Sequence, residues 1–210
     1  DSILHAEAMA ARALVKGLDP RRVRVGLITF AGEVDPTTGE RRSPTQQDAW
    51  VEVPLTSDVA QVSQAIEAVL ARGASGATDF AAGIRLGVRE LAGLSGSRSQ
   101  PRPNSRKVML FLTDGVPSLP IGKGDYTDEG DNEAAVGAAQ LARSAGIAIN
   151  SYALGPNALS QPFAVTEIAR TTLGTFTPVM NPGDIVALLQ GISFANIEDV
   201  VLSNLTTGEL

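Results

Sequence analysis

The chain has 210 residues, 43% of them hydrophobic and 19% charged, a composition typical of a globular protein with one sizeable core. Its formal net charge of −6 argues against nucleic-acid binding, which needs clustered lysine and arginine. The longest apolar stretches fall well short of the roughly 20 residues that span a bilayer, so we expect no membrane insertion. The lack of cysteine excludes disulfides, thiolate catalysis and cysteine-bound zinc.

The first part of the chain predicts a helix followed by a hairpin. Apolar residues recur at helical spacing over residues 2–16, and residues 22–30 are apolar on nearly both faces, as in a buried strand. Residues 31–48 are rich in proline, threonine, glycine and charge, which indicates an exposed loop. Residues 49–55 alternate and contain Pro54, so we expect an edge strand that pairs with the first strand.

The rest of the chain alternates helices with strands. The expected elements are helices at 59–71 and 78–91, a linker at 93–105, a strand at 107–113, a helix at 132–144, a strand at 147–154, a helix at 163–172, a short strand at 174–178 and a helix at 183–192. Such alternation predicts crossover connections and one α/β domain with a mostly parallel sheet. We interpret the chain as a piece of a longer protein, with this domain at 1–192 and an extended segment at 193–210 leading to a further domain.

One carboxylate follows a predicted buried strand directly. In "KVMLFLTDGVP" an apolar run ends at Asp114, and Gly115 allows a sharp turn there. In an open α/β sheet, ligands bind beyond the carboxyl ends of the strands, which makes Asp114 a candidate binding residue. An Asp-Gly pair also commonly caps a turn, and spacing alone leaves that alternative open.

A second candidate lies at a glycine-rich helix entry, "SGATDFAAG". Thr78 and Asp79 are both residues that cap the free amides at a helix start. If Asp79 is the cap, the Thr78 hydroxyl can point outward to a ligand. If both serve the helix, the motif is structural only.

Together these segments resemble the von Willebrand factor type A domain. The resemblance rests on "VRVGLITFAG", "GATDFAAGIRLGVREL", "KVMLFLTDGVP" and "ARSAGIAINSYALG", and it extends to about residue 192. It implies a three-layer, doubly wound, Rossmann-like fold with helices on both faces and one antiparallel edge strand. Many such domains carry a metal-ion-dependent adhesion site, and the resemblance places two of its ligands at Thr78 and Asp114. Hydroxyl and carboxylate ligands suit Mg²⁺, or else Mn²⁺ or Ca²⁺.

The family's D-x-S-x-S motif and the first strand that carries it are absent from the sequence. That strand would lie between the strands predicted at 22–30 and 107–113, so we expect a gap about two strand spacings wide at the centre of the sheet. Unpaired, buried backbone groups on both sides would be prohibitive. We therefore hypothesise that an upstream segment or another chain supplies the strand and completes the metal site. Without it, we expect weak cation binding or none and an unstable isolated chain.

A loop beyond Asp114, "GKGDYTDEGDNEAAV", clusters Asp125, Asp128, Glu129 and Asp131. A second cation site is one interpretation, but the spacing does not fit a D-x-D-x-D-G loop. A solvated loop in which Asp131 caps the next helix fits the pattern better.

The sequence offers little support for catalysis. The motifs G-x-S-x-G and G-x-G-x-x-G are absent, "GVPSLPIGKG" lacks the spacing of a phosphate-binding loop, and the single histidine, His5, falls on the first predicted helix. No nucleophile–base pair is visible, so we predict that the protein is not an enzyme. Asn204 begins a short glycosylation sequon that arises often by chance.

The resemblance implies a non-catalytic protein-binding or adhesion module of a larger protein, which binds an acidic group of its partner through a divalent cation. Two alternatives remain: a metal-independent structural or assembly domain, and a metal-dependent hydrolase that uses Asp114. The tail "VVLSNLTTGEL" resembles a run into a further β-rich domain, which favours an extracellular or cell-surface location.

Overall fold

The computed structural model describes residues 3–124, 127–192 and 198–203. In chain order its elements are α1 (Ile3–Gly17), β1 (Val23–Phe30), β2 (Ala49–Thr56), α2 (Val59–Arg72), α3 (Phe80–Ala92), β3 (Arg106–Thr113), α4 (Glu129–Ser144), β4 (Ile147–Leu154), α5 (Gly155–Ser160), α6 (Phe163–Thr172), β5 (Phe176–Val179), the 3₁₀-helix η1 (Pro182–Asp184), α7 (Ile185–Gln190) and β6 (Glu198–Ser203).

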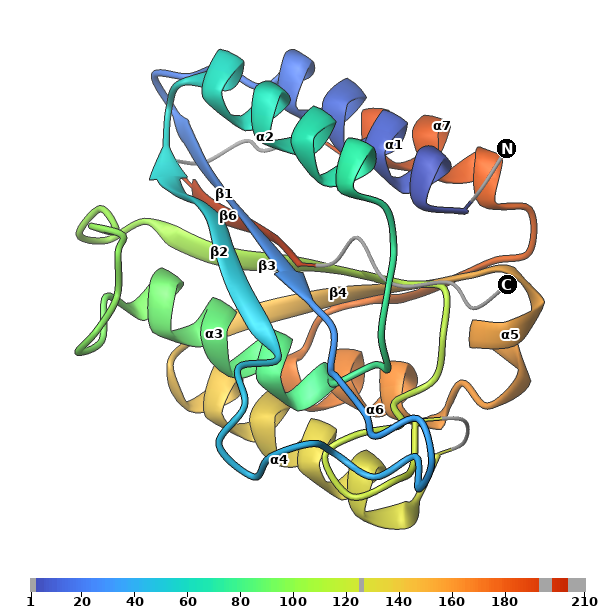
Figure 1. The fold of residues 1–210 in the computed structure, drawn as a ribbon. Helices are drawn as coiled ribbons and strands as arrows, with labels where there is room; N and C mark the ends of the chain where they lie inside the picture. The colour runs from blue at the N-terminus through green and yellow to red at the C-terminus, as the bar shows by residue number, and fades with distance from the viewer. Residues whose placement is uncertain (1–2, 125–126, 193–197, 204–210) are drawn as a thin grey trace.

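These elements form three layers. The sheet has the order β2-β1-β6-β3-β4-β5, with β1 and β2 antiparallel and the other neighbouring strands parallel. Helices α1, α2 and α7 cover one face, and α3, α4 and α6 cover the other (Figure 1). The predicted doubly wound α/β fold with one antiparallel edge strand is confirmed.

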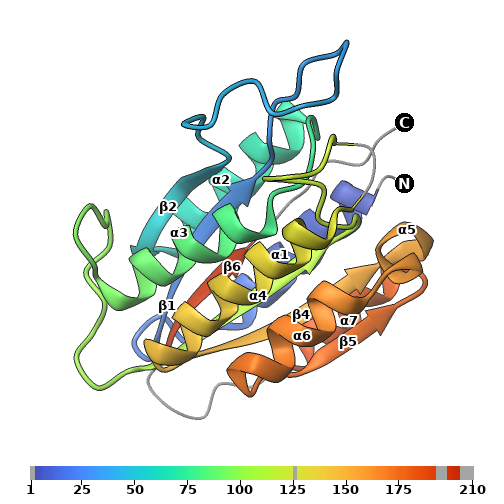
Figure 2. The same ribbon diagram turned by 90° about the horizontal axis from the view of Figure 1, so that it is seen from below.

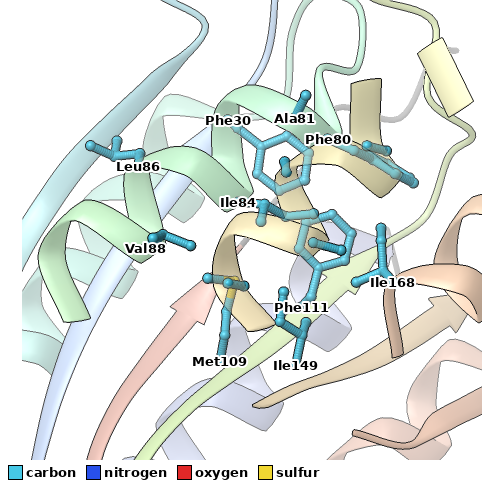
Figure 3. Packing of buried hydrophobic residues seen from close by; sticks show 14 of the residues in the cluster. Phe30, Phe80, Ala81, Ile84, Leu86, Val88, Met109, Phe111, Ile149 and Ile168 are labelled. Carbon is cyan, nitrogen blue, oxygen red and sulfur yellow. The ribbon is translucent and has the colours of Figure 1, made fainter. Parts of the chain in front are cut away.

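Two apolar cores separate these layers, because successive strand residues face opposite sides. In β3, Val108, Leu110 and Leu112 pack toward α1 and α2, whereas Met109 and Phe111 pack toward α3 and α4. The second core contains the aromatic cluster of Phe30, Phe80 and Phe111 (Figure 3), whose ring centroids lie 5.0 to 6.0 Å apart. This cluster joins the ends of β1 and β3 to the first turn of α3.

The centre of the sheet differs from the expected gap. Strand β6 lies between β1 and β3 and is parallel to both, with Val200 opposite Val25 on one side and Val108 on the other. The expectation of a missing central strand is therefore wrong: the chain's own C-terminal segment fills the position. Val200, Val201 and Leu202 are buried, as a strand covered on both faces requires. The expectation of a gap rests on the family's strand order, in which the central position belongs to a first strand that this sequence lacks.

This finding also corrects the domain boundary, since residues 198–203 belong to the sheet. The expected instability of the isolated chain loses its physical basis, because β6 pairs the backbone of β1 and β3. Residues 193–197 and 204–210, including the sequon at Asn204, lie outside the described residues.

A buried carboxylate ties β6 to the linker before β3. Asp199 is fully buried, and its Oδ2 accepts hydrogen bonds from the Arg102 amide at 2.8 Å and from the Ser105 hydroxyl at 2.6 Å. The Arg102 guanidinium lies 3.6 Å from the other carboxylate oxygen. The predicted linker is therefore packed against the sheet.

Some predicted boundaries shift. Helix α4 begins at Glu129, three residues before the expected start, because Asp128 caps it and Asp131 completes a capping box. The short helix α5 was not expected, and β5 starts at Phe176. Among the described helices, none has the length and hydropathy to cross a membrane.

Candidate binding site at the carboxyl edge of the sheet

The predicted site residues lie where the three central strands end. Ser203 of β6 pairs with Ile28 of β1 and Phe111 of β3, so these strands finish at one edge. The loop after β1, the entry to α3 and the loop after β3 all leave from it. The loops after β1 and β3 run beside each other (Figure 2), and the Lys123 ammonium lies 3.6 Å from the Glu40 carboxylate.

The segments that carry Thr78 and Asp114 meet at this edge. The Thr78 carbonyl accepts hydrogen bonds from the amides of Ser118 at 3.0 Å and Leu119 at 3.2 Å, and the Thr78 amide donates to the Ser118 hydroxyl. The Thr78 Oγ1 lies 3.4 Å from where a Cβ on Gly115 would be. Thr78 is 6% exposed and Asp114 is 4% exposed. The structure thus brings the two predicted residues into one region, while their role as metal ligands stays a prediction.

The backbone before Thr78 is positioned by a close approach of two loops. Gly32 and Ala77 exchange two hydrogen bonds, of 2.6 and 2.7 Å, and Gly76 lies against the Gly32 carbonyl. Gly76 has a φ of +89°, and a Cβ there would come within 2.7 Å of that carbonyl oxygen. Only glycine fits at position 76 without strain. The contact with Gly32 therefore fixes the position of the backbone that leads into Thr78.

Asp79, and not Thr78, caps helix α3. Its Oδ1 accepts a hydrogen bond from the Ala82 amide at 2.8 Å, which is the arrangement expected if the Thr78 hydroxyl is to be spare. Burial raises the pKa of Asp79, and the nearby Asp48 carboxylate raises it further. Asp48 is itself buried and pairs with Arg41.

The turn after β3 is held by Thr113. Its Oγ1 accepts a hydrogen bond from the Gly115 amide at 3.2 Å and donates to the Gly115 carbonyl at 3.1 Å. The residue that caps this turn is therefore the one before Asp114, which weakens the interpretation of Asp114 as a turn cap.

The acidic loop serves the fold. Asp131, fully buried, accepts hydrogen bonds from the amides of Ile121, Gly122 and Asp128 at 2.7 to 3.1 Å. The prediction that Asp131 is the helix cap is wrong by one turn, because Asp128 holds that position. The Asp131 carboxylate is occupied by amides of the loop beyond Asp114, which disfavours a second cation site in this loop. Asp125 lies outside the described residues.

A buried hydroxyl that the sequence analysis missed also lies at this edge. Ser203, at the end of β6, is fully buried, and within the described part of the chain its Oγ has no hydrogen-bond partner. The signal that could have found it is the apolar run Val200–Leu202, which resembles the other buried strands and ends at this serine.

The donors at the edge match the chemistry of a hard cation but are few. Mg²⁺ prefers oxygen ligands and keeps several waters when one or two carboxylates bind it. Thr78 and Asp114 supply one hydroxyl and one carboxylate. Within residues 3–124, 127–192 and 198–203 there is no group of three or more histidine or acidic side chains that could hold a metal. The donor types therefore fit Mg²⁺, and their number fits only a weak site.

A groove of about 740 Å³ extends to Gly76, two residues before Thr78. Its walls are the end of β1, the exposed face of β2 and the loop 73–76, and Trp50, 39% exposed, contributes the largest apolar side chain. Glu52 pairs with Arg72 along one wall, and Arg42 pairs with Glu33 along another. Aromatic side chains are enriched at protein–protein interfaces relative to the rest of the surface.

The strand order and the helices on both faces define a doubly wound α/β domain with one antiparallel edge strand. A sequence model of the von Willebrand factor type A domain matches residues 6–185. The chain belongs to this family. Domains of the family are generally protein-interaction modules and not enzymes.

Solved structures agree on the fold. An aerotolerance-related membrane protein of Bacteroides fragilis NCTC 9343, solved with multiple mutations to serine, has a TM-score of 0.60 at 20% identity, covering 89% of this chain and 85% of its own. The VWA domain of SpRpn10 has a TM-score of 0.56 at 14% identity, covering 90% and 87%. A von Willebrand factor type A protein from Catenulispora acidiphila has a TM-score of 0.58 at 15% identity and covers 89% of this chain, which spans only 36% of it. No curated protein sequence matched.

Proposed function

We propose that this domain is a non-catalytic protein-binding module whose binding face is the carboxyl edge of the sheet. The observation that carries the proposal is that the segments of Thr78 and Asp114, far apart in sequence, pack against each other in one buried region. The Trp50 groove reaches Gly76, two residues before Thr78. The partner is a protein that lays an acidic group near Thr78 and apolar side chains in the groove.

A divalent cation, Mg²⁺ in the first instance, would be held by the Asp114 carboxylate and the Thr78 hydroxyl, and it would attract the partner's carboxylate. The nearby N-terminus of α3 favours negative charge at the same place. One carboxylate and one hydroxyl make a weak site. An upstream segment or another chain that adds oxygen ligands would strengthen it.

Binding of the metal alone tests the cation. Manganese, titrated into the chain and followed by electron paramagnetic resonance, should bind weakly and saturably to the wild type, and binding should be lost in Asp114→Asn and reduced in Thr78→Val. Asp19→Asn, at the opposite edge, removes the same charge and should leave the titration unchanged. Equal loss in Asp19→Asn would show that manganese senses net charge only.

Selection from a displayed peptide library, with and without a chelator, tests the partner chemistry. We expect enrichment of acidic peptides that disappears with the chelator and in Asp114→Asn. Enrichment that persists under both conditions would favour the metal-independent structural or assembly domain instead. Steady turnover of ester or phosphoester substrates, lost in Asp114→Asn, would favour a hydrolase and overturn the proposal.

The location that we propose is extracellular or at the cell surface. The support is the similarity to a protein described as an aerotolerance-related membrane protein. Protease treatment of intact cells that express the full-length protein should digest this domain. Protection until the cells are lysed would contradict the proposal.

A further inference from the structure

A pocket lies at the opposite edge of the sheet, where the parallel strands begin. It has a volume of about 320 Å³ and is formed by the start of β1, the end of β2, the turn before α2 and the linker before β3. Its lining residues are Arg24, Leu55, Thr56, Ser57, Arg98 and Gln100. None of them belongs to the carboxyl-edge site.

Two guanidinium groups line this pocket, and backbone carbonyls hold both. Arg24 Nη1 donates to the Gln100 carbonyl at 2.8 Å, and Arg98 Nη1 donates to the Val51 carbonyl at 2.8 Å. Among the described residues, neither arginine forms an ion pair with a carboxylate. A guanidinium has several N–H donors, so each keeps donors and its full charge for a ligand.

The linker that carries Arg98 is fixed by a buried network. Glu90, 1% exposed, accepts hydrogen bonds from the Arg98 amide at 3.1 Å and from the Ser99 hydroxyl at 2.6 Å. Ser99 in turn accepts a hydrogen bond from the Leu55 amide at 2.9 Å, which ties the linker to β2. The arginine is therefore anchored at its backbone and at its head, and little ordering is left for a ligand to impose.

Hydroxyl donors complete the lining. Thr56 Oγ1 accepts from the Asp58 amide at 3.1 Å, so its proton is free to point to a ligand, and Ser57 adds a second hydroxyl. The neighbouring acid, Asp58, is directed to helix α2, where its Oδ1 accepts from the Ala60 and Gln61 amides.

Several basic residues lie at this end of the sheet, although the chain as a whole is acidic. Further basic residues at the starts of β1 and β3 are Arg21, Arg22, Arg106 and Lys107. Acids lie at the same edge: Asp19 pairs with Arg21, and Asp199 is engaged by the linker. Glu198, the first residue of β6, is in register with Arg106. Clustered charge of one sign raises the local concentration of oppositely charged ligands.

We propose that this pocket binds a tetrahedral oxyanion, phosphate or sulfate, as a free ion or as an ester group on a partner. Donors approach from the β1 side, the linker and the turn before α2, so they surround a ligand from several directions. Such an arrangement suits a tetrahedral dianion better than a planar carboxylate, and arginine is the side chain best matched to such oxygens.

Isothermal titration with inorganic phosphate and with sulfate tests the proposal, at an ionic strength kept constant with chloride because salt screens such contacts. We expect saturable binding of both anions, weakened about tenfold in Arg24→Gln and in Arg98→Gln. Arg143→Gln removes an exposed arginine outside the pocket, at the end of α4, and should leave binding unchanged. Arg98→Lys, which keeps the charge without the fork of donors, should fall between wild type and Arg98→Gln.

Three results would overturn the proposal: absence of saturable binding in the wild type, equal weakening by Arg143→Gln, or acetate binding as tight as phosphate. Thermal unfolding of each variant separates loss of the pocket from loss of the fold, and Ser57→Ala offers a milder change that keeps both arginines. A phosphoserine arm distinguishes the sources. Affinity equal to that of phosphate indicates an ester on a partner, and a clear preference for inorganic phosphate indicates the free ion.

Discussion

The two edges of the sheet carry ionisable side chains of opposite charge, buried at one edge and partly or fully exposed at the other. At the carboxyl edge the buried ionisable side chains include Asp48, Asp79 and Asp114, whereas the pocket at the other edge is lined by Arg24 and Arg98. Asp114 follows β3, Asp48 precedes β2 and Asp79 caps α3, whereas Arg24 lies at the start of β1 and Arg98 lies in the linker before β3. Under our two proposals, one mostly parallel sheet carries a cation site at one edge and an anion site at the other.

A substitution in β6 should have the largest effect, because this strand runs from one edge of the sheet to the other and supports both sites. Val201→Asp buries a charge without a partner in the core between the sheet and helices α3 and α4, and we expect a loss of about 3–5 kcal/mol in the free energy of unfolding. Both sites should fail together. Denaturant unfolding measures the loss, and Leu141→Asp, on the exposed surface of α4, should cost little. A stable Val201→Asp variant would argue against β6 as the central strand.

A smaller change should disturb one edge only. Asp131→Ala removes the acceptor of three backbone amides in the loop beyond Asp114, and we expect a loss of about 2–4 kcal/mol with faster proteolysis in this loop. Phosphate binding at the opposite edge should persist under native conditions. If the anion pocket weakened as much as the loop, the two edges would be coupled and not independent.

A pH-dependent effect is expected at Asp79. Burial raises its pKa in the folded state, so the folded chain holds a proton more tightly than the unfolded chain does, and stability falls as pH rises through the folded pKa. Asp79→Asn keeps a helix cap without a charge, so we expect it to gain up to about 1 kcal/mol at neutral pH. The gain should vanish in acid, below the ordinary aspartate pKa. Unfolding curves from neutral to acidic pH measure it, and a gain that grows in acid would contradict the assignment.

The smallest expected effect is that of Ser203→Ala, for which stability and manganese binding are compared. Because its buried hydroxyl has no hydrogen-bond partner within the described residues, Ser203→Ala should leave stability unchanged or slightly raised. If the hydroxyl also contributes to cation binding, the manganese titration should weaken while the unfolding curve does not. A clear loss of stability would show instead that the hydroxyl is satisfied within the fold.

The helices and strands with strong periodicity could be predicted from sequence. Residues 22–30, 107–113 and 147–154 have apolar runs that only buried parallel strands explain, and the observed strands agree closely. The family resemblance predicts that Thr78 and Asp114 lie in one region, and the structure brings their segments together. Two capping-type residues this far apart in sequence carry no local signal of such proximity.

Other features could not be reached this way. Strand β6 is short, and its place between β1 and β3 depends on which segment best fills a vacant position, which is a property of the whole sheet. The anion pocket depends on Glu90 and Ser99 holding the linker, a contact that sequence spacing does not indicate. The start of α4 was missed because several adjacent acids could each have capped it.

The position of β6 in the chain has a consequence for how the molecule acquires its shape. The pair β1–β2 and the group β3–β4–β5 precede it, and each can assemble from neighbouring segments, but nothing in the sheet joins them until β6 arrives. During synthesis, β1 and β3 therefore leave the ribosome before β6, and the backbone edge of each that β6 will pair with is still unpaired. Contacts this distant along the chain form slowly, so a newborn molecule is most vulnerable to aggregation just before its last strand emerges.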